Sequence, residues 1–314
     1  MTTQHRPTAH DMLASIGNTP VFRLRRMPRS GSAEIWLKWE GANPTGSMKD
    51  RMALSMIEGA EKRGELKLGG RVVEYTGGST GSSLAMVCAA KGYRSHFVSS
   101  DAFAEEKLAT MRAFGGTVEV IPSKDRKITP ELIQAIVARA QELSREANTF
   151  WTDQFNNPDN RSGYHGMGEE ILNQLGSFDA FVMSAGTGGC FSGNAEVFKE
   201  RLPAAKCVAV EPASSRHLSS GPLGGHRIEG IGPGFIPKIM RMDLVDEIIS
   251  VNNEDAYRVA HELARTEGIF GGISTGANIF AALEIARKLG PGRRVVTIIV
   301  DSGLRYLQGD LFRQ

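Results

Sequence analysis

The stretch RVVEYTGGSTGSSLAMVCAAKGY (71–93) predicts a β-strand, a glycine-rich loop and an α-helix in direct succession. Its β-branched and aromatic start favours a strand over 71–76, and the uninterrupted run from Ser82 to Lys91 favours a helix. The same plan returns in FDAFVMSAGTGGCFSGNAEVFKE (178–200). Repeated strand–loop–helix units are typical of parallel sheets covered by helices, so we predict an α/β protein.

The rest of the chain continues this alternation. Further strands are expected at 33–40, 94–100, 117–122, 206–212 and 294–303, and further helices at 105–113, 129–146, 253–266 and 277–289. Several of these strands are apolar on both faces, which suits parallel strands buried between helices. The chain from about Thr45 to Gln154 would form one such αβ layer, and the later strands a second. A cleft between two layers is a natural ligand site.

Composition and charge exclude several classes of protein. The 314 residues suffice for about two domains, and 37 basic against 35 acidic residues leave a net charge of +2 without any run of like charge. We therefore expect neither nucleic acid nor a membrane as partner. The three cysteines (Cys88, Cys190 and Cys207) are too few and too scattered for a disulfide framework or a metal cluster. The N-terminus lacks an apolar stretch typical of a signal peptide, so a cytoplasmic location is expected.

The segment NPTGSMKDR (43–51) places a lysine at an unusual position. Pro44 and Gly46 predict a turn, and Ser47 with Asp50 forms an S-x-x-D capping pattern before a helix. Lys49 then falls in the first helical turn, where the helix dipole disfavours a cation by ~0.3–1 kcal/mol. Either Lys49 is an ordinary exposed lysine, or it works as a neutral amine that condenses with an aldehyde.

The two glycine loops, 76–81 and 186–189, each offer bare backbone N–H groups followed by a helix N-terminus, which is an anion-binding arrangement. Neither loop matches the P-loop or the G-x-G-x-x-G pattern, and singly each is also compatible with a plain turn. Together with Lys49, they suggest a ligand set with two anionic groups and one carbonyl. Pyridoxal 5'-phosphate (PLP) with an amino-acid substrate is such a set.

At this point the chain resembles a known family, the cysteine synthase and cystathionine β-synthase group of fold-type-II PLP enzymes. NPTGSMKDR resembles the family's N-P-x-x-S-x-K-D-R, GTGG (186–189) with Gly193 resembles its phosphate loop, and TGGSTG (76–81) stands where the family has T-S-G-N-T-G. The remaining family motifs follow in order as QFNNPDN (154–160), EGIGPGFIP (229–237), GISTGA (272–277) and DSGLRYLQGDLF (301–312).

The resemblance implies a fold, an assembly and a reaction. The fold would be two three-layer αβα open-sheet domains with the cofactor in the cleft between them. Residues 45–156 would form the smaller, substrate-loop domain, and 1–44 with 157–314 the larger, cofactor-phosphate domain. A cytoplasmic homodimer is implied. The implied reaction is a β-replacement on a serine-type amino acid through an aminoacrylate, with sulfide as the default nucleophile.

The resemblance also implies residue roles. Lys49 would form the Schiff base with PLP and move protons at the substrate Cα. The phosphate would be held by Gly186, Thr187, Gly188, Gly189 and Cys190, and the α-carboxylate of the substrate by Thr76, Gly77, Thr80 and Gln154. Ser79 would face the ring hydroxyl, and Ser274 the ring nitrogen. A hydroxyl there is a weak partner for a protonated ring, which favours β-elimination over transamination. From the residues alone, Ser274 is equally compatible with a helix N-cap.

Four positions depart from the family pattern. Gly77 and Ser79 replace the serine and asparagine of the substrate loop, Cys190 replaces a threonine, and Leu304 replaces a glutamate; GYHGMGEE (163–170) also differs from the usual T-x-G-P-E. We expect the first two changes to enlarge the substrate loop and to admit a substrate or nucleophile bulkier than acetylserine and sulfide. Two alternatives remain open: a β-eliminating lyase or dehydratase, and a non-catalytic family member that acts as a binding or regulatory protein.

Overall fold

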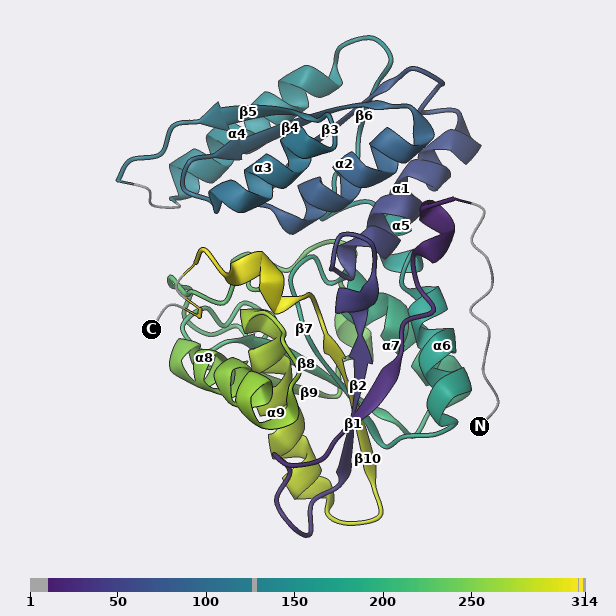
Figure 1. Cartoon of the computed structure of the whole chain (residues 1–314), viewed down its shortest axis with the longest axis vertical. Helices are drawn as coiled ribbons and strands as arrows, with labels where there is room; N and C mark the ends of the chain where they lie inside the picture. Colours follow the sequence, from purple (N-terminus) through teal and green to yellow (C-terminus); the bar gives the residue numbers. More distant parts are fainter. Residues whose placement is uncertain (1–10, 126–128, 310, 313–314) are drawn as a thin grey trace.

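A computed structural model describes residues 11–125, 129–309 and 311–312 of the chain. Figure 1 shows two α/β halves stacked along the long axis of the molecule, each built on its own sheet. The upper sheet has the strand order β5-β4-β3-β6 and is entirely parallel. The lower sheet has the order β1-β2-β10-β7-β8-β9 and is parallel except for the antiparallel pair of β1 with β2. The predicted α/β class is confirmed.

The strands of the two sheets are short and follow the β-branched runs of the sequence. The upper sheet contains β3 (Arg71–Tyr75), β4 (Arg94–Ser100), β5 (Thr117–Ile121) and β6 (Thr149–Trp151). The lower sheet contains β1 (Val21–Leu24), β2 (Glu34–Trp39), β7 (Ala180–Ser184), β8 (Lys206–Pro212), β9 (Glu247–Val251) and β10 (Arg294–Ile299). All seven strands expected from the sequence are present. Three strands were missed (β1, β6 and β9), and each is a sheet edge with a single neighbour.

Helices connect and cover these strands. They are α1 (Lys49–Arg63), α2 (Ser79–Lys91), α3 (Glu105–Ala113), α4 (Pro130–Ser144), α5 (Pro158–Ser162), α6 (His165–Leu175), α7 (Gly189–Arg201), α8 (Asn253–Glu262), which continues as a π-turn over Leu263–Glu267, and α9 (Ile273–Leu289). Short 3-10 turns occur at Leu13–Ser15, Glu40–Ala42, Met242–Leu244 and Gly303–Tyr306. Within the described residues, no helix is both long enough and apolar enough to cross a membrane.

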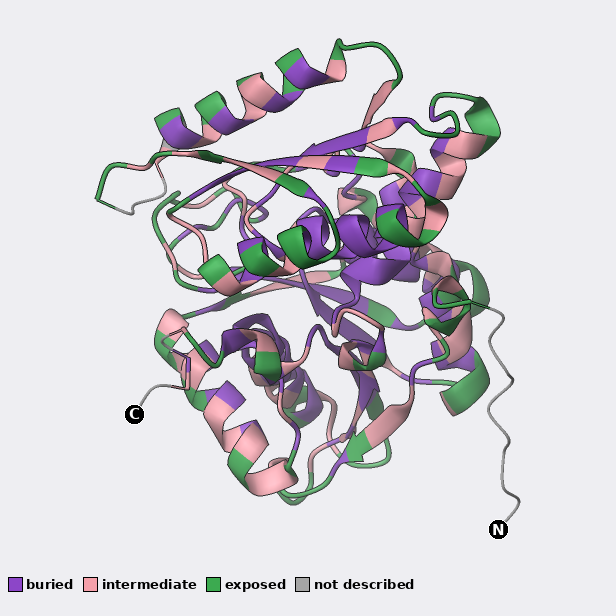
Figure 2. Cartoon of the chain, turned by 45° about the horizontal axis from the view of Figure 1, so that its top comes forward, coloured by how far each residue is buried: buried purple, intermediate pink, exposed green. Residues whose placement is uncertain are grey.

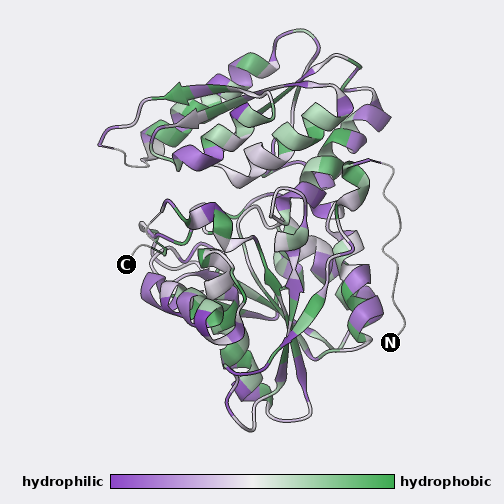
Figure 3. Ribbon diagram, in the orientation of Figure 1, coloured by the Kyte–Doolittle hydropathy of each residue, from purple (hydrophilic) through white to green (hydrophobic). Residues whose placement is uncertain are grey.

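Apolar side chains alternate between the faces of the sheets, and this alternation builds the core on both sides. In β7, Phe181 and Met183 pack toward α6 and α7, whereas Ala180 and Val182 pack toward α8 and α9. The first of these clusters continues through α1 to the inner face of the upper sheet. Figure 2 shows α1 as a largely buried helix at the centre of the molecule. Figure 3 shows the contrast between the hydrophobic strands of the lower sheet and the hydrophilic exposed side of α8.

Two helices, α2 and α9, begin earlier than predicted, and the early starts place motif residues inside them. The helix α9 begins at Ile273 with Gly272 as its N-cap, so the N-cap interpretation of Ser274 is wrong. The helix α1 begins at Lys49, and the Ser47 hydroxyl accepts a hydrogen bond from the Lys49 N–H (3.3 Å), as the capping pattern predicts for Ser47. The other half of the pattern is wrong, because Asp50 accepts hydrogen bonds from Thr45 instead. The helix α2 begins at Ser79. In α2 and α9, a glycine of the preceding loop (Gly78 and Gly272) is the N-cap residue.

The sheets support, without proving, the division of the chain into domains. The four strands of the upper sheet lie within 71–151, inside the segment 45–156. The lower sheet takes two strands from the first 44 residues and the others from 180–299. We therefore propose 45–156 as the smaller domain, and 1–44 with 157–314 as the larger one.

Candidate functional site

The turn that carries Lys49 is held by a segment 250 residues away along the chain. The Met48 N–H donates to the carbonyl of Val300 (2.9 Å), and the Ser302 N–H donates to the carbonyl of Gly46 (2.8 Å). Ser47 and Asp301 form an isolated antiparallel bridge between these two bonds. The start of α1 is therefore fixed against the residues that follow β10.

The lysine itself is buried. Lys49 is 9% exposed, and burial lowers the pKa of its ammonium, an effect that Cys190 and Asp301 only partly oppose. Among the described residues, none hydrogen-bonds or ion-pairs with its Nζ atom. An isolated ammonium is costly in such a place, and the N-terminus of α1 adds to the cost. The exposed-lysine interpretation is wrong, and the arrangement favours a neutral amine.

The opening residues of α1 are braced by side chains from both halves. The Asp50 carboxylate accepts hydrogen bonds from the backbone N–H (2.8 Å) and the hydroxyl (2.5 Å) of Thr45, which closes the turn. Arg305 donates to the Thr45 carbonyl (2.6 Å) and to the Ser79 hydroxyl (3.3 Å). Arg305 thus links the lysine turn to the first residue of α2. The sequence alone predicts no role for Arg305, although it lies in the motif 301–312.

The loop at 186–190 is packed so tightly that its glycines have no room for a side chain. At Gly186, Gly188 and Gly189, an added Cβ would overlap Gly230, Met240 and Asn160 respectively. Gly188 also has a φ of +80°, which side chains rarely adopt. The N–H groups of Gly188, Cys190 and Phe191 have no hydrogen-bond acceptor among the described residues. Free N–H groups at the start of α7 form the cradle that a phosphate requires.

Cys190 closes this cradle as a neutral thiol. Burial raises the pKa of Cys190 to about 12, and the charge of Lys49 offsets only part of this rise. Its sulfur lies 3.6 Å from Nδ2 of Asn194. The S–H group is therefore available as a weak donor toward the loop.

The second loop, 76–81, presents the same arrangement at the start of α2. The Thr76 hydroxyl accepts hydrogen bonds from the N–H groups of Gly78 (3.0 Å) and Gly81 (3.2 Å), which fixes the shape of the loop. The N–H groups of Gly77, Ser79 and Thr80 have no acceptor among the described residues. This loop is thus a second anion cradle.

Two amide side chains join the two cradles. The Thr80 hydroxyl donates to Oε1 of Gln154 (2.8 Å), whose Nε2 donates to the carbonyl of Tyr75 (3.1 Å). Asn160 donates to the carbonyl of Gln154 (2.6 Å) and to the hydroxyl of Thr187 (3.2 Å). Gln154 is where the sequence placed it, beside the substrate loop. Asn160 was not assigned a role, although it ends the quoted motif 154–160.

Below the second cradle lies a buried carboxyl group that sequence reasoning missed. Glu74 accepts hydrogen bonds from the Thr152 hydroxyl (2.6 Å) and the Gln154 N–H (3.0 Å). The Tyr75 N–H (2.9 Å) also donates to it. Burial raises its pKa to about 7. Glu74 therefore fixes the backbone of Gln154 relative to the substrate loop.

The expected enlargement of the substrate loop is wrong at Gly77. An added Cβ at Gly77 would lie 2.8 Å from Cε1 of Phe103, so the ring of Phe103 fills the space that a serine would use. Phe103 precedes α3 and packs over the outer side of the loop. Position 77 holds a glycine because the large side chain of Phe103 occupies the adjacent space, and the change from serine does not open the substrate loop.

Ser274 is the second residue of α9 and is 3% exposed. Its hydroxyl has no hydrogen-bond partner among the described residues. The neighbouring Thr275 hydroxyl accepts a bond from the Val300 N–H (3.0 Å), and the carbonyl of Val300 receives the Met48 N–H. The serine and the lysine turn are consequently positioned by the same residue.

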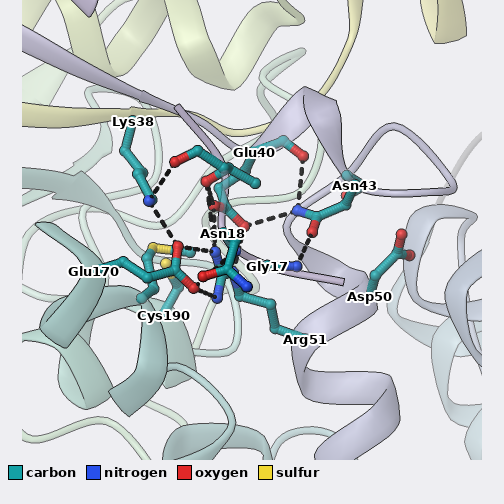
Figure 4. Close-up of polar contacts among 12 residues, drawn as sticks. Gly17, Asn18, Lys38, Glu40, Asn43, Asp50, Arg51, Glu170 and Cys190 are labelled. Carbon is teal, nitrogen blue, oxygen red and sulfur yellow. Dashed lines mark hydrogen bonds and ion pairs between the residues drawn. The ribbon is translucent and has the colours of Figure 1, made fainter. Parts of the chain in front are cut away.

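Behind Lys49, four charged side chains form a compact buried network (Figure 4). Arg51 donates to both oxygens of Glu40 (2.7 and 2.9 Å) and to both oxygens of Glu170 (2.8 Å each). Lys38 pairs with Glu170 at 2.6 Å. Burial alone would raise the pKa of Glu170, but the hydrogen bonds and charges of Arg51 and Lys38 lower it to about 2. The two cations balance the two anions, and the network anchors the first turn of α1.

The arrangement is that of a site for one aldehyde and two anions. Gln154 and Asn160 link a tight glycine cradle with free N–H groups to a second cradle. Arg305 links the second cradle to the turn of Lys49, a buried amine for which the described residues supply no counter-ion. These residues fit PLP, whose phosphate suits the first cradle and whose aldehyde suits the amine. The described residues contain no group of three or more His, Cys, Asp or Glu side chains that could hold a metal ion.

Comparison with known proteins agrees with this geometry. A family model described as "Pyridoxal-phosphate dependent enzyme" matches residues 12–301. A cysteine synthase of Staphylococcus aureus (strain Mu50) is 40% identical over 300 residues, which is 95% of each chain. The structure of an O-ureido-L-serine synthase superposes with a TM-score of 0.92 at 35% identity, covering 98% of this chain and 96% of the other.

A hydrogen sulfide-producing enzyme from Fusobacterium nucleatum superposes with a TM-score of 0.90 at 39% identity, covering 96% of this chain and 98% of the other. These likenesses extend over nearly the whole chain and include both sheets. Because the family model covers residues 12–301 and the cysteine synthase is 40% identical over 95% of each chain, the chain belongs to the family of pyridoxal-phosphate dependent enzymes.

Proposed function

We propose that the protein catalyses β-replacement on a serine-type amino acid, in which a group on Cβ is exchanged for a nucleophile. The carrying observation is Lys49, a buried amine without a partner among the described residues. It lies near Cys190 of the first cradle, and Arg305 links its turn to Ser79 of the second. When bound, PLP supplies an aldehyde and an electron-withdrawing ring that make the Cα–H bond of an amino acid acidic. The names of the relatives support this reaction, because cysteine and O-ureidoserine differ only in the group on Cβ.

The residues divide the work by position. Lys49 holds the cofactor and then, as a free amine, takes the proton from the substrate Cα and returns it. The loop from Gly186 to Gly189, with the Thr187 hydroxyl and the Cys190 thiol, would hold the phosphate. Ser274 would hydrogen-bond the ring nitrogen, and Ser79, which accepts a hydrogen bond from Arg305, would face the ring hydroxyl. Thr76, Gly77, Thr80 and Gln154 receive the α-carboxylate of the substrate.

The test is product analysis with O-acetyl-L-serine and sulfide. β-Replacement predicts cysteine and one equivalent of acetate, with little pyruvate. A β-eliminating lyase or dehydratase would release pyruvate and ammonia without needing sulfide, and a binding protein would bind the amino acid without turnover. Sulfide is the default nucleophile, and a panel of thiols and hydroxyurea in its place identifies the preferred one.

We expect Gly188→Ala to weaken PLP binding and to destabilise the fold by about 1–3 kcal/mol, because its Cβ would lie 2.8 Å from Met240 and its φ is +80°. Gly176→Ala is a matched control, since Gly176 has a φ of +75° and open space around its Cβ position. Equilibrium dialysis with PLP and urea unfolding measure both effects. Equal PLP affinity in the two variants would count against the first cradle as the phosphate site.

Gly77→Ser should lower kcat/KM by about tenfold, because the new side chain must displace the ring of Phe103 and distort the loop. Phe103→Ala should restore much of the loss when it is added to Gly77→Ser, since it reopens the space. Steady-state kinetics on O-acetyl-L-serine check both variants. If Gly77→Ser alone behaves as wild type, the packing of Phe103 does not control the loop.

We further propose a cytoplasmic homodimer, as the family resemblance implies. Light scattering coupled to size-exclusion chromatography measures the mass directly, against 34.0 kDa for one chain. A single-chain mass at micromolar concentration would contradict the dimer.

A further inference from the structure

Outside the groups assigned above, one buried cation lies against the substrate loop. Lys107 belongs to α3 and is 5% exposed. Its aliphatic stem packs on Gly78, where an added Cβ would overlap Cδ of the lysine. Its Nζ lies 4.9 Å from the centre of the Tyr306 ring. The stem therefore covers the second cradle, and the charged end points from the upper sheet toward the lower one.

This ammonium has few partners for a buried charge. Among the described residues, Glu229 is the only hydrogen-bond acceptor for Lys107, which has three N–H donors. Lys38, equally buried, instead contacts the Thr19 carbonyl (2.7 Å), Gln174 (2.9 Å) and Glu170 (2.6 Å). Lys107 thus retains donor capacity that Lys38 does not, although leaving buried donors unused is costly.

The single counter-ion of Lys107 is weakly held. The Glu229 side chain is 49% exposed, and ion pairs with such an exposed partner contribute little to stability because water screens them. Glu229 opens the segment EGIGPGFIP (229–237), which lies in the lower half. Exchange of its carboxylate for another anion would therefore cost little. An ion pair that served only to hold the two halves together would be stronger if both of its members were buried.

The neighbours of Lys107 place it beside the reacting groups. The Tyr306 ring stands under the ammonium, and its hydroxyl donates to Asp301 (2.6 Å). Asp301 bridges Ser47, two residues before Lys49. Gly78, under the stem, lies between the free N–H groups of Gly77 and Ser79. A ligand held by those N–H groups has Lys107 as a neighbouring cation.

We infer that Lys107 forms an additional anion subsite, beside the two glycine cradles, which binds a carboxylate or phosphate carried beyond Cβ of the amino acid or by the nucleophile. The inference rests on the proposed β-replacement. Glu229 occupies the subsite until the ligand anion displaces it. The subsite distinguishes anionic from neutral partners of similar size, because a charge-assisted hydrogen bond to a buried ammonium is strong.

Two pairs of compounds separate the possible sources of the anion. O-Phospho-L-serine and L-serine differ by the group on the amino acid, and their affinities for the PLP-loaded protein are measured by calorimetry. Mercaptoacetate and 2-mercaptoethanol differ by the charge on the nucleophile, and their kcat/KM values are measured with O-acetyl-L-serine. For each pair, the anionic-to-neutral ratio is compared in wild type, Lys107→Met, Glu229→Gln and the control Lys91→Met, which removes another ion-paired lysine on α2.

In at least one pair, Lys107→Met should lower the ratio by about tenfold or more, and Glu229→Gln should raise it because the competing carboxylate is gone. Lys91→Met should leave both ratios within about twofold of wild type. The pair that responds identifies the source of the anion. If Lys107→Met changes neither ratio, or if both members of the ion pair lower it alike, Lys107 only holds the two halves together and the inference is overturned.

The two proposals fail separately. Absence of turnover with every nucleophile would refute β-replacement, whereas the calorimetric ratio tests Lys107 without any turnover. If Lys107→Met does not fold, Glu229→Gln decides alone: an unchanged or lowered ratio in both pairs overturns the inference.

Discussion

Lys49→Ala should lower kcat/KM for β-replacement by about 10³-fold or more, while the protein stays folded. The variant loses both the covalent anchor of PLP and the amine that moves the Cα proton. Stability should be maintained, because no described residue bonds Lys49 Nζ and its burial disfavours the charge. The measurements are steady-state kinetics, the visible spectrum of the protein and urea unfolding.

Lys62→Ala serves as the control, since Lys62 lies in the last turn of the same helix and is exposed. It should retain activity and colour. Borohydride reduction of wild type should fix the cofactor on the peptide that contains Lys49. Recovery of the label on a different lysine would show that the assignment of Lys49 is wrong.

Arg51→Met should reduce the free energy of unfolding by about 3–5 kcal/mol, since it leaves Glu40 buried without its cation and Glu170 with Lys38 alone. Arg63→Met is the control on the same helix. Arg63 is 42% exposed in its pairs with Glu65 and Asp159, so its loss should cost less than about 1 kcal/mol. Urea unfolding at pH 7 compares the two. Similar losses in both variants would contradict a stabilising role for the network.

The same network predicts how stability depends on pH. Glu170 has a pKa of about 2 in the folded protein, below the usual value of about 4.3 for an unfolded glutamate. Its contribution is therefore fully present above about pH 5 and is lost as the pH falls toward 2. Wild type should lose more stability over this range than Glu170→Gln, which has no carboxylate to protonate. Parallel pH profiles for the two proteins would exclude Glu170 as a source of acid sensitivity.

The features that sequence reasoning found are those encoded by neighbouring residues. The units at 71–93 and 178–200 each contain a hydrophobic pattern and a glycine-rich loop within one short segment. The order strand, loop and helix could therefore be predicted from these residues alone. The position of Lys49 in a first helical turn was itself the sign of an unusual amine. Three of the four edge strands (β1, β6 and β9) were missed because their apolar runs are short, whereas the edge strand β5 was predicted.

The features that it missed depend on residues distant in the chain. Lys38, Glu40, Arg51 and Glu170 share no spacing pattern, and only the fold brings them together. At Gly77, the ring of Phe103 fills the space that a serine side chain would occupy. A comparison of position 77 alone with the family pattern does not reveal this, because Phe103 belongs to another segment. Local sequence patterns predict individual helices and strands. Contacts between side chains from distant segments are seen only in the folded structure.

The pairing of 46–48 with 300–302 has a consequence for the order in which the protein is made. During synthesis, β2 emerges from the ribosome early, but its parallel neighbour β10 is among the last segments to follow. Until then, one edge of β2 is unpaired in the nascent chain, and the turn of Lys49 lacks its hydrogen bonds to residues 300–302. An unpaired strand edge favours non-native pairing with other strands. Cofactor capture is therefore a late event of biogenesis, and a chain that stops before residue 300 has the lysine without the means to hold it in place.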